Sequence, residues 1–264
     1  MQLKISHTTR YAFETPPAYG LQQLRLTPNS NAGQNVLEWG LDIQGAKVQA
    51  TYDDEHGNVS HLVALNPNVN ELVITSQGLI DMTDQNGVVG PQQGYAPLWL
   101  FLRPTALTGI GPQIKELSAT IPEDPQVADF HDLSKRIASQ VAYTTGSTVS
   151  TTSAEQAITL GKGVCQDHAH IFIAAARHAG HPARYVSGYL MMNDRIDQDA
   201  THAWAEIWVG DLGWTGFDVS NGISPDMRYV RLATGLDYSQ AAPISGMTIG
   251  GSGESIDVNV QVQQ

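Results

Sequence analysis

The most informative stretch of this sequence is Gly163-Val164-Cys165-Gln166-Asp167-His168-Ala169-His170-Ile171, which carries the only cysteine of the chain. We expect an apolar helix to follow the glycine turn, from about Cys165 to Ala179, because Gly180 then supplies a stop signal. The positive end of a helix dipole favours a thiolate over a thiol. The position of Cys165 therefore predicts a nucleophile.

Two strand-like segments downstream each carry one polar residue among aromatic ones. The first begins with His202 and the second ends with Asp218. The turn Gly210-Asp211-Leu212-Gly213 between them predicts a hairpin. If the centre of the hairpin lies near residue 210 or 211, the strand register places Asp218 opposite or diagonal to His202. If the hairpin is centred on the four turn residues, the register is one residue off, and a bulge would be required. Together with Cys165, these residues form the nucleophile, base and carboxylate that cysteine acyl transfer needs.

Other interpretations of the same residues remain open. An isolated cysteine is more often a buried structural residue, but the helix after Cys165 and the downstream histidine and aspartate favour catalysis. The three side chains also include zinc-ligand types, so a zinc site is an alternative. His168 and His170 lie two residues apart on a helix and cannot bind one ion together. His178 and His181 are near the helix end, where positive charge is favourable.

Composition limits the partners and the compartment that we expect. The 264 residues include 14 Lys+Arg and 26 Asp+Glu, a formal net charge of −12. No basic run offsets this balance, so we expect neither nucleic acid nor a membrane surface as a partner. A single cysteine excludes an intrachain disulfide, and a reactive thiol suits a reducing compartment. With no signal-peptide pattern and no apolar run of about 18 residues, we predict a cytoplasmic protein.

Residues 1–103 show a strand pattern with period two. It is clearest at Leu37, Trp39, Leu41 and Ile43, which alternate with polar residues or glycine and predict a half-buried strand. The further strands expected here are Leu3–Phe13, Lys47–Tyr52, Val59–Leu65 and Leu72–Ile80. Several short strands at this spacing predict a β-sandwich-like domain.

The sequence pattern of residues 104–245 predicts helices followed by strands. A first helix contains Ile110, Ile114 and Leu117. Asp124 can cap a second helix, and the Ser153–Gln156 spacing predicts a capping box for a third. After the helix at Cys165, the expected strands are Ala183–Leu190, His202–Val209 and Trp214–Asp218. They predict an antiparallel sheet and an α+β fold. The last segment, residues 246–264, alternates from Ile256 to Val262 and predicts one final strand.

Four motifs resemble those of the bacterial transglutaminase-like cysteine-protease family. They are Gly163–Asp167, Ala183–Tyr189, His202–Trp204 and Gly213–Gly222. The resemblance implies a papain-like core behind an N-terminal β domain, with Cys165 as nucleophile, His202 as base and Asp218 as orienting carboxylate. The family pattern Phe-Asp-Pro-Thr-Asn stands here as Phe217–Asn221, without the proline.

The function that we predict from these residues is a cysteine-dependent peptidase, amidase or transglutaminase that proceeds through a thioester. Hydrolysis is slightly preferred over transfer, because no site for a lysine-bearing acceptor is evident. The alternative is a peptide-binding or protein-binding module without catalysis on the same fold. This chemistry requires no metal and no organic cofactor. The expected partner is a peptide or protein substrate with an amide group, and the sequence does not predict an oligomeric state.

The oxyanion donors are only partly identified from the sequence. The backbone N–H of Cys165 is the natural first donor because it lies at a helix start. Gln166 is adjacent and Gln156 is near, but the capping box is the better role for Gln156. The second donor remains unassigned at this point.

Overall fold

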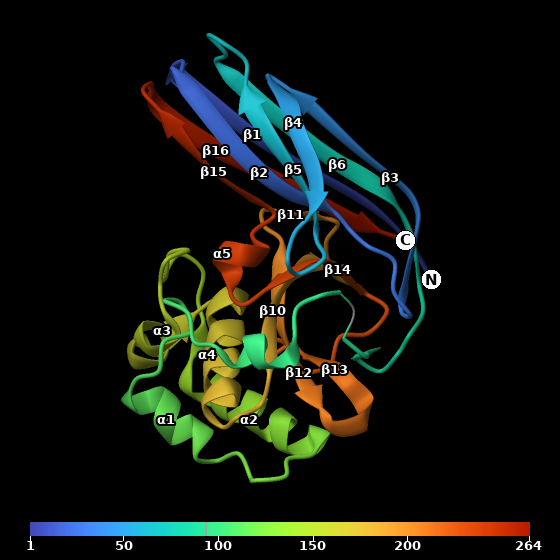
Figure 1. The fold of residues 1–264 in the computed structure, drawn as a ribbon, viewed down its shortest axis with the longest axis vertical. Coiled ribbons are helices and arrows are strands. Elements are labelled where there is room, and N and C mark those ends of the chain that lie inside the picture. The colour runs from blue at the N-terminus through green and yellow to red at the C-terminus, as the bar shows by residue number, and fades with distance from the viewer. Residues whose placement is uncertain (93) are drawn as a thin grey trace.

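The computed structural model describes residues 1–92 and 94–264. A pair of β sheets extends from one end of a mixed body of helices and sheet (Figure 1). This arrangement confirms the predicted α+β fold with a strand-rich N-terminal region. Among the described residues, no helix is long and apolar enough to cross a membrane.

The N-terminal sheets have the strand orders β11-β16-β1-β6-β3 and β15-β2-β5-β4. Their first strands are β1 (Gln2–Thr15), β2 (Tyr19–Thr27), β3 (Gln34–Gln44), β4 (Ala46–Asp53), β5 (Val59–Leu65) and β6 (Glu71–Met82). Leu3 and Ile5 from one sheet share a core with Leu24 and Val63 from the other. The predicted sandwich is therefore present, with burial of apolar faces between two sheets as its main stabilising interaction.

Two details of this sandwich differ from the sequence prediction. Leu37 was expected with the buried residues of its strand, but it is 45% exposed. The pairing of β3 with β6 contains a register shift between Val36 and Glu38, so Val36 takes the position that packs on the core. β2 was not predicted, because its buried positions include the polar residues Gln22 and Arg25.

Four helices form one side of the second body. They are α1 (Pro112–Ser118), α2 (Val127–Gln140), α3 (Ala154–Leu160) and α4 (Cys165–His178). The capping box of Ser153 and Gln156 is confirmed, with hydrogen bonds in both directions. Asp124 as the cap of α2 is wrong. Gln126 is the N-cap instead, because its backbone N–H donates to the Asp129 carboxylate at 2.8 Å.

The helices pack on an antiparallel sheet with the order β14-β10-β12-β13-β7. Its strands are β7 (Val88–Gly90), β10 (Ala183–Leu190), β12 (His202–Val209), β13 (Gly213–Phe217) and β14 (Tyr229–Gly235). Phe172 of α4 stacks on Phe217 of β13, with ring centroids 5.3 Å apart. The predicted antiparallel sheet is confirmed in β10, β12 and β13. Neither β7 nor β14 was predicted.

The C-terminal residues return to the N-terminal sandwich. The predicted final strand is present as β16 (Ser252–Gln263), which pairs with β1. A further strand that was not predicted, β15 (Ile244–Ile249), precedes it and pairs with β2. β11 (Asp197–Gln198) then adds to the outer side of β16, with Gln198 opposite Val260. The segment between β11 and His202 is thus attached to the N-terminal sandwich at one end and to the second sheet at the other.

Two amide side chains of the N-terminal region cover the free edge of β14. Gln34 donates to the carbonyl of Arg231 at 2.9 Å and accepts from its N–H at 2.8 Å. Asn58 makes the same pair of bonds with the backbone of Thr234, both 2.8 Å long. An amide group offers both a donor and an acceptor, so each side chain replaces one residue of a missing neighbour strand.

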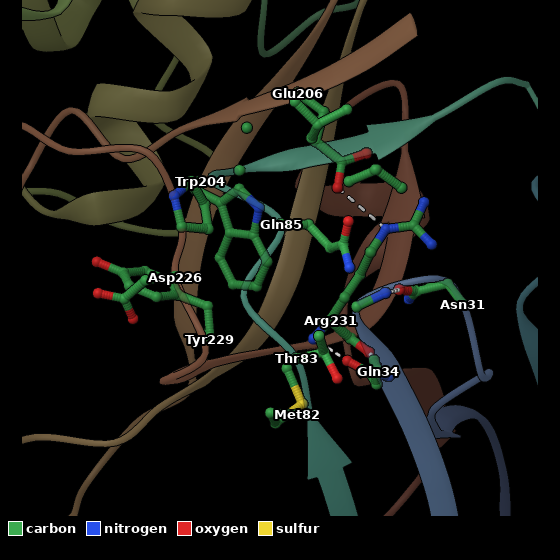
Figure 2. A pocket seen from close by; sticks show the side chains of 16 residues that line it. Asn31, Gln34, Met82, Thr83, Gln85, Trp204, Glu206, Asp226, Tyr229 and Arg231 are labelled. Carbon is green, nitrogen blue, oxygen red and sulfur yellow. Dashed lines mark hydrogen bonds and ion pairs between the residues drawn. The ribbon is translucent and has the colours of Figure 1, made fainter. Parts of the chain in front are cut away.

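A buried cluster of charges joins three adjacent strands of the second sheet. Glu206 of β12 is fully buried and accepts from Arg184 of β10 at 2.6 Å and from Arg231 of β14 at 3.1 Å. The Arg184 guanidinium also lies 4.0 Å from the ring centroid of Trp214. Glu206 and Arg231 line a small hollow of about 60 Å³ between the N-terminal region and this sheet. Figure 2 shows the side chains around it.

We expect replacement of Glu206 by glutamine to lower the free energy of unfolding by about 3–5 kcal/mol, because it leaves the buried Arg184 without its counter-charge. Urea denaturation followed by circular dichroism measures the change. Glu71→Gln is the matched control: its partner Arg10 is on the surface, so the loss should be about 0–1 kcal/mol. Equal losses in the two variants would contradict the importance of the buried cluster.

Candidate active site

Cys165 is the first residue of α4, and the side chain of Asp167 holds the turn that precedes it. Asp167 Oδ2 accepts from the N–H of Val164 at 2.8 Å and from the hydroxyl of Thr148 at 2.7 Å. Gly163 is required by this contact, since a Cβ there would lie 2.7 Å from the Cβ of Asp167. The turn before Cys165 is therefore fixed by the buried Asp167 carboxylate, and the partly exposed thiol lies at the helix start.

His202 and Asp218 meet across the hairpin of β12 and β13. The register pairs Ala205 with Phe217 without a shift, so Asp218 is level with Trp204 and diagonal to His202. His202 Nε2 lies 2.6 Å from Asp218 Oδ2, and both side chains are buried. The diagonal placement predicted from the turn position is confirmed, and no bulge is needed.

Asp218 Oδ2 accepts two further hydrogen bonds. The donors are Asn221 Nδ2 at 2.6 Å and the Tyr229 hydroxyl at 2.8 Å. Reciprocal backbone bonds between Asp218 and Ile223, with Gly222 at φ +68°, close the turn here without the proline of the family pattern. Asn221 is part of the sequence motif, but Tyr229 lies on β14 and had no signal in the sequence.

These contacts determine the charges of the pair. Burial lowers the pKa of His202, but hydrogen bonding and charge interactions with Asp218 and Cys165 outweigh it and raise the pKa to about 10. Burial raises the pKa of Asp218, but its bonds to His202, Asn221 and Tyr229 bring it below the usual value. At neutral pH the pair is thus an imidazolium and a carboxylate. Nε2 is engaged by Asp218, which leaves Nδ1 for other contacts.

Cys165 and His202 line one cleft of about 380 Å³. Its walls also include Tyr143, Tyr185 and Arg195. β8 (Ala142–Tyr143) pairs in parallel with β9 (Lys162–Gly163), which places Tyr143 beside Gly163. Burial and interactions with Cys165 raise the pKa of Tyr143 to about 12, so its hydroxyl keeps its proton and can donate. Tyr143 was not predicted from the sequence, since the pairing that brings it to the cleft is between segments with no regular pattern.

The neighbouring histidines have other roles. His168 Nε2 lies 2.9 Å from the Val141 carbonyl and Nδ1 lies 2.9 Å from the Ser220 hydroxyl, so this ring joins α4 to the turn after Asp218. His170 accepts from the Tyr238 N–H at 3.1 Å, and burial lowers its pKa to about 4. Both are structural residues.

The zinc alternative finds no support in the geometry. Across residues 1–92 and 94–264, no group of three or more His, Cys, Asp and Glu side chains is arranged to hold a metal ion. The direct 2.6 Å contact between His202 and Asp218 also leaves no room for an ion between them.

Comparisons with known proteins agree with this architecture. The model of the transglutaminase-like superfamily matches residues 115–219, and that of the bacterial transglutaminase-like N-terminal region matches residues 3–81. An uncharacterized protein of Mycobacterium tuberculosis is 31% identical over 288 residues, covering 98% of this chain and 91% of that protein. An uncharacterized protein of Mycobacterium leprae is 28% identical over 275 residues, covering 99% and 98%.

One solved structure has the same fold over the whole chain. It is a crystal structure of a candidate cysteine protease from Cytophaga hutchinsonii, 21% identical in sequence, with a TM-score of 0.76. The match covers 100% of this chain and 98% of that one. The N-terminal sandwich and the second body therefore occur together in both proteins.

We expect Asp218→Asn to bring the pKa of His202 down from about 10 towards the ordinary value of about 6.5, because the charge that holds the proton is lost. In the unchanged protein, the raised pKa stabilises the fold fully below about pH 6.5, and this contribution is lost as the pH rises through about 10. NMR titration of the imidazole measures the pKa directly. Asp211→Asn, in the exposed hairpin turn, is the control, and an identical titration in both variants would contradict the assignment.

Proposed function

The chain belongs to the transglutaminase-like superfamily, and from that premise we propose that it is a cysteine-dependent acyl-transfer enzyme acting on amide or peptide carbonyls. The observation that carries the proposal is the shared cleft. The thiol of Cys165 at a helix start and the His202–Asp218 pair line the same cavity, and Cys165 is among the groups that raise the pKa of His202. A nucleophile, an imidazole that can donate and accept a proton, and an orienting carboxylate are thereby combined.

In the first half of the reaction, the Cys165 thiolate attacks the substrate carbonyl carbon and forms a C–S bond. The carbonyl electrons move to the oxygen and then return as the C–N bond breaks. The leaving amine or ammonia takes the proton of the His202 imidazolium. The products of this step are a thioester on Cys165 and a neutral imidazole.

In the second half, His202 accepts a proton from water or from an acceptor amine as that molecule attacks the thioester. The C–S bond then breaks, which releases the acid or the new amide and restores the thiolate and the imidazolium. Asp218 holds the ring throughout through Nε2, so Nδ1 carries both proton transfers.

Two donors can stabilise the oxyanion that forms in each half. The N–H of Cys165 is at the first residue of α4, where a helix leaves backbone donors free. The Tyr143 hydroxyl is our second donor, because it lines the cleft, keeps its proton and interacts with Cys165. This residue fills the position that the sequence left unassigned.

We expect Cys165→Ala to abolish turnover while the protein stays folded, because the thiol supplies chemistry rather than packing. The assay is mass spectrometry of glutamine-containing peptides incubated with the protein, with and without an added amine. Deamidation or cleavage identifies water as the acceptor, and addition of the amine identifies transfer. Cys165→Ser should be almost as inactive. Turnover that persists in Cys165→Ala would overturn the proposal, and binding without turnover in the unchanged protein would favour a peptide-binding module.

For the oxyanion donor, we expect Tyr143→Phe to lower the acylation rate by about 10²–10³, the usual effect of removing one such donor. Substrate affinity should change much less, because the bond strengthens as the oxyanion forms. Single-turnover measurement of thioester formation separates the two effects. Tyr19→Phe, on the exposed side of β2, is the control. Equal acylation rates in the two variants would remove Tyr143 from the reaction.

A further inference from the structure

A second hollow adjoins the catalytic cleft and is formed largely by the N-terminal sandwich. It measures about 280 Å³. Four of its lining residues also line the cleft: Asp199, Ala200, Thr201 and Tyr238. The two cavities therefore share one wall made of the segment before His202 and of α5 (Tyr238–Ala241). The second hollow is therefore the immediate neighbour of the catalytic cleft.

The far side of the hollow is a face of the β1–β16 pair. Tyr11 lies directly opposite Ile256, and Thr9 lies opposite Val258. Residues two apart in a strand point to the same side of the sheet, so these side chains form one continuous surface. Ile256 lines the hollow and is nevertheless 56% exposed. The surface thus offers an apolar side chain that no segment of the described chain covers completely.

The shared wall is held in place at both of its ends. On one side, β11 pairs with β16 through Gln198 and Val260, and the Gln261 amide donates to Asp197 at 2.8 Å. On the other side, His202 begins β12 and is bonded to Asp218. The position of the hollow relative to the reacting groups is therefore preformed, as is usual for substrate sites.

Two tyrosines add polar groups to this apolar surface. Burial, followed by the charges of Glu254 and Tyr238, raises the pKa of Tyr11 to about 12. Burial also raises the pKa of Tyr238. Both hydroxyls stay protonated over the physiological range and can donate to carbonyl groups. An apolar wall with a few fixed donors suits a peptide segment.

We propose that this hollow is a substrate subsite that binds an apolar side chain, branched aliphatic or aromatic, of a peptide whose reacting carbonyl lies at Cys165. This inference rests on the proposed function, because it takes Cys165 as the point of attack. Its physical basis is the adjacency of the two cavities, together with the exposed apolar side chain of Ile256 beside the partly buried Val258. The N-terminal sandwich would then contribute to substrate selection as well as to the fold.

The test uses acetylated nonapeptides with glutamine fixed at the centre and one flanking position varied at a time between leucine, phenylalanine, glycine and aspartate. We expect one flanking position at which leucine or phenylalanine gives about 10-fold or greater kcat/KM than glycine, the scale of apolar pocket discrimination. Ile256→Asp should bring this ratio close to one. Ile249→Asp, on an equally exposed isoleucine of β15 outside both cavities, should keep it.

An apolar preference that survives in Ile256→Asp, or no preference at any position, would overturn the subsite. Failure of the proposed function is distinguishable, because then no peptide is turned over by the unchanged protein. In that case, fluorescence anisotropy of the same labelled peptides on the Cys165→Ala variant decides the question. Selective binding of the apolar peptides that is lost on adding Ile256→Asp supports the subsite, and equal binding of all four peptides contradicts it.

Discussion

One oxygen atom, Oδ2 of Asp218, is the acceptor on which the candidate site depends. It accepts hydrogen bonds from His202, Asn221 and Tyr229, which come from a strand, a turn and a second strand. Burying a carboxylate is costly unless charged and polar donors surround it, and these three donors meet that requirement. The same bonds orient the imidazole ring. One set of contacts thus stabilises the buried charge of Asp218 and also fixes the orientation of the His202 ring.

The two bodies of the protein share an apolar core that includes Val230 and Leu232 of β14, and polar contacts with the backbone also join them. Gln34 and Asn58 occupy the edge of β14, and β11 pairs with β16. Such contacts are directional, so they fix the relative position of the bodies more precisely than apolar burial alone would. Tyr229 begins β14, and His202 follows β11. Short segments of chain therefore connect the N-terminal sandwich to Tyr229 and to His202, two of the residues that bind Asp218.

Local patterns in the sequence were sufficient for the parts of the fold that depend on nearby residues. The capping box at Ser153 and the diagonal contact of His202 with Asp218 both follow from short spacings. Tyr229 and Tyr143 could not be found in this way. β14 is buried along almost its whole length and lacks the alternation that reveals a half-buried strand. β8 has only two residues, and its pairing with β9 is set by tertiary structure.

The pairing of β11 with β16 also determines when the segment before His202 can reach its final structure during synthesis. A ribosome adds β11, β12 and Asp218 well before it adds β16, so the segment that leads into His202 has no partner strand until the last part of the chain emerges. The thiol of Cys165 is present earlier still. A nascent chain therefore carries the thiol for some time without the anchored imidazole beside it. Proteolytic loss of β16 would leave the segment before His202 without its partner strand again, as in the nascent chain.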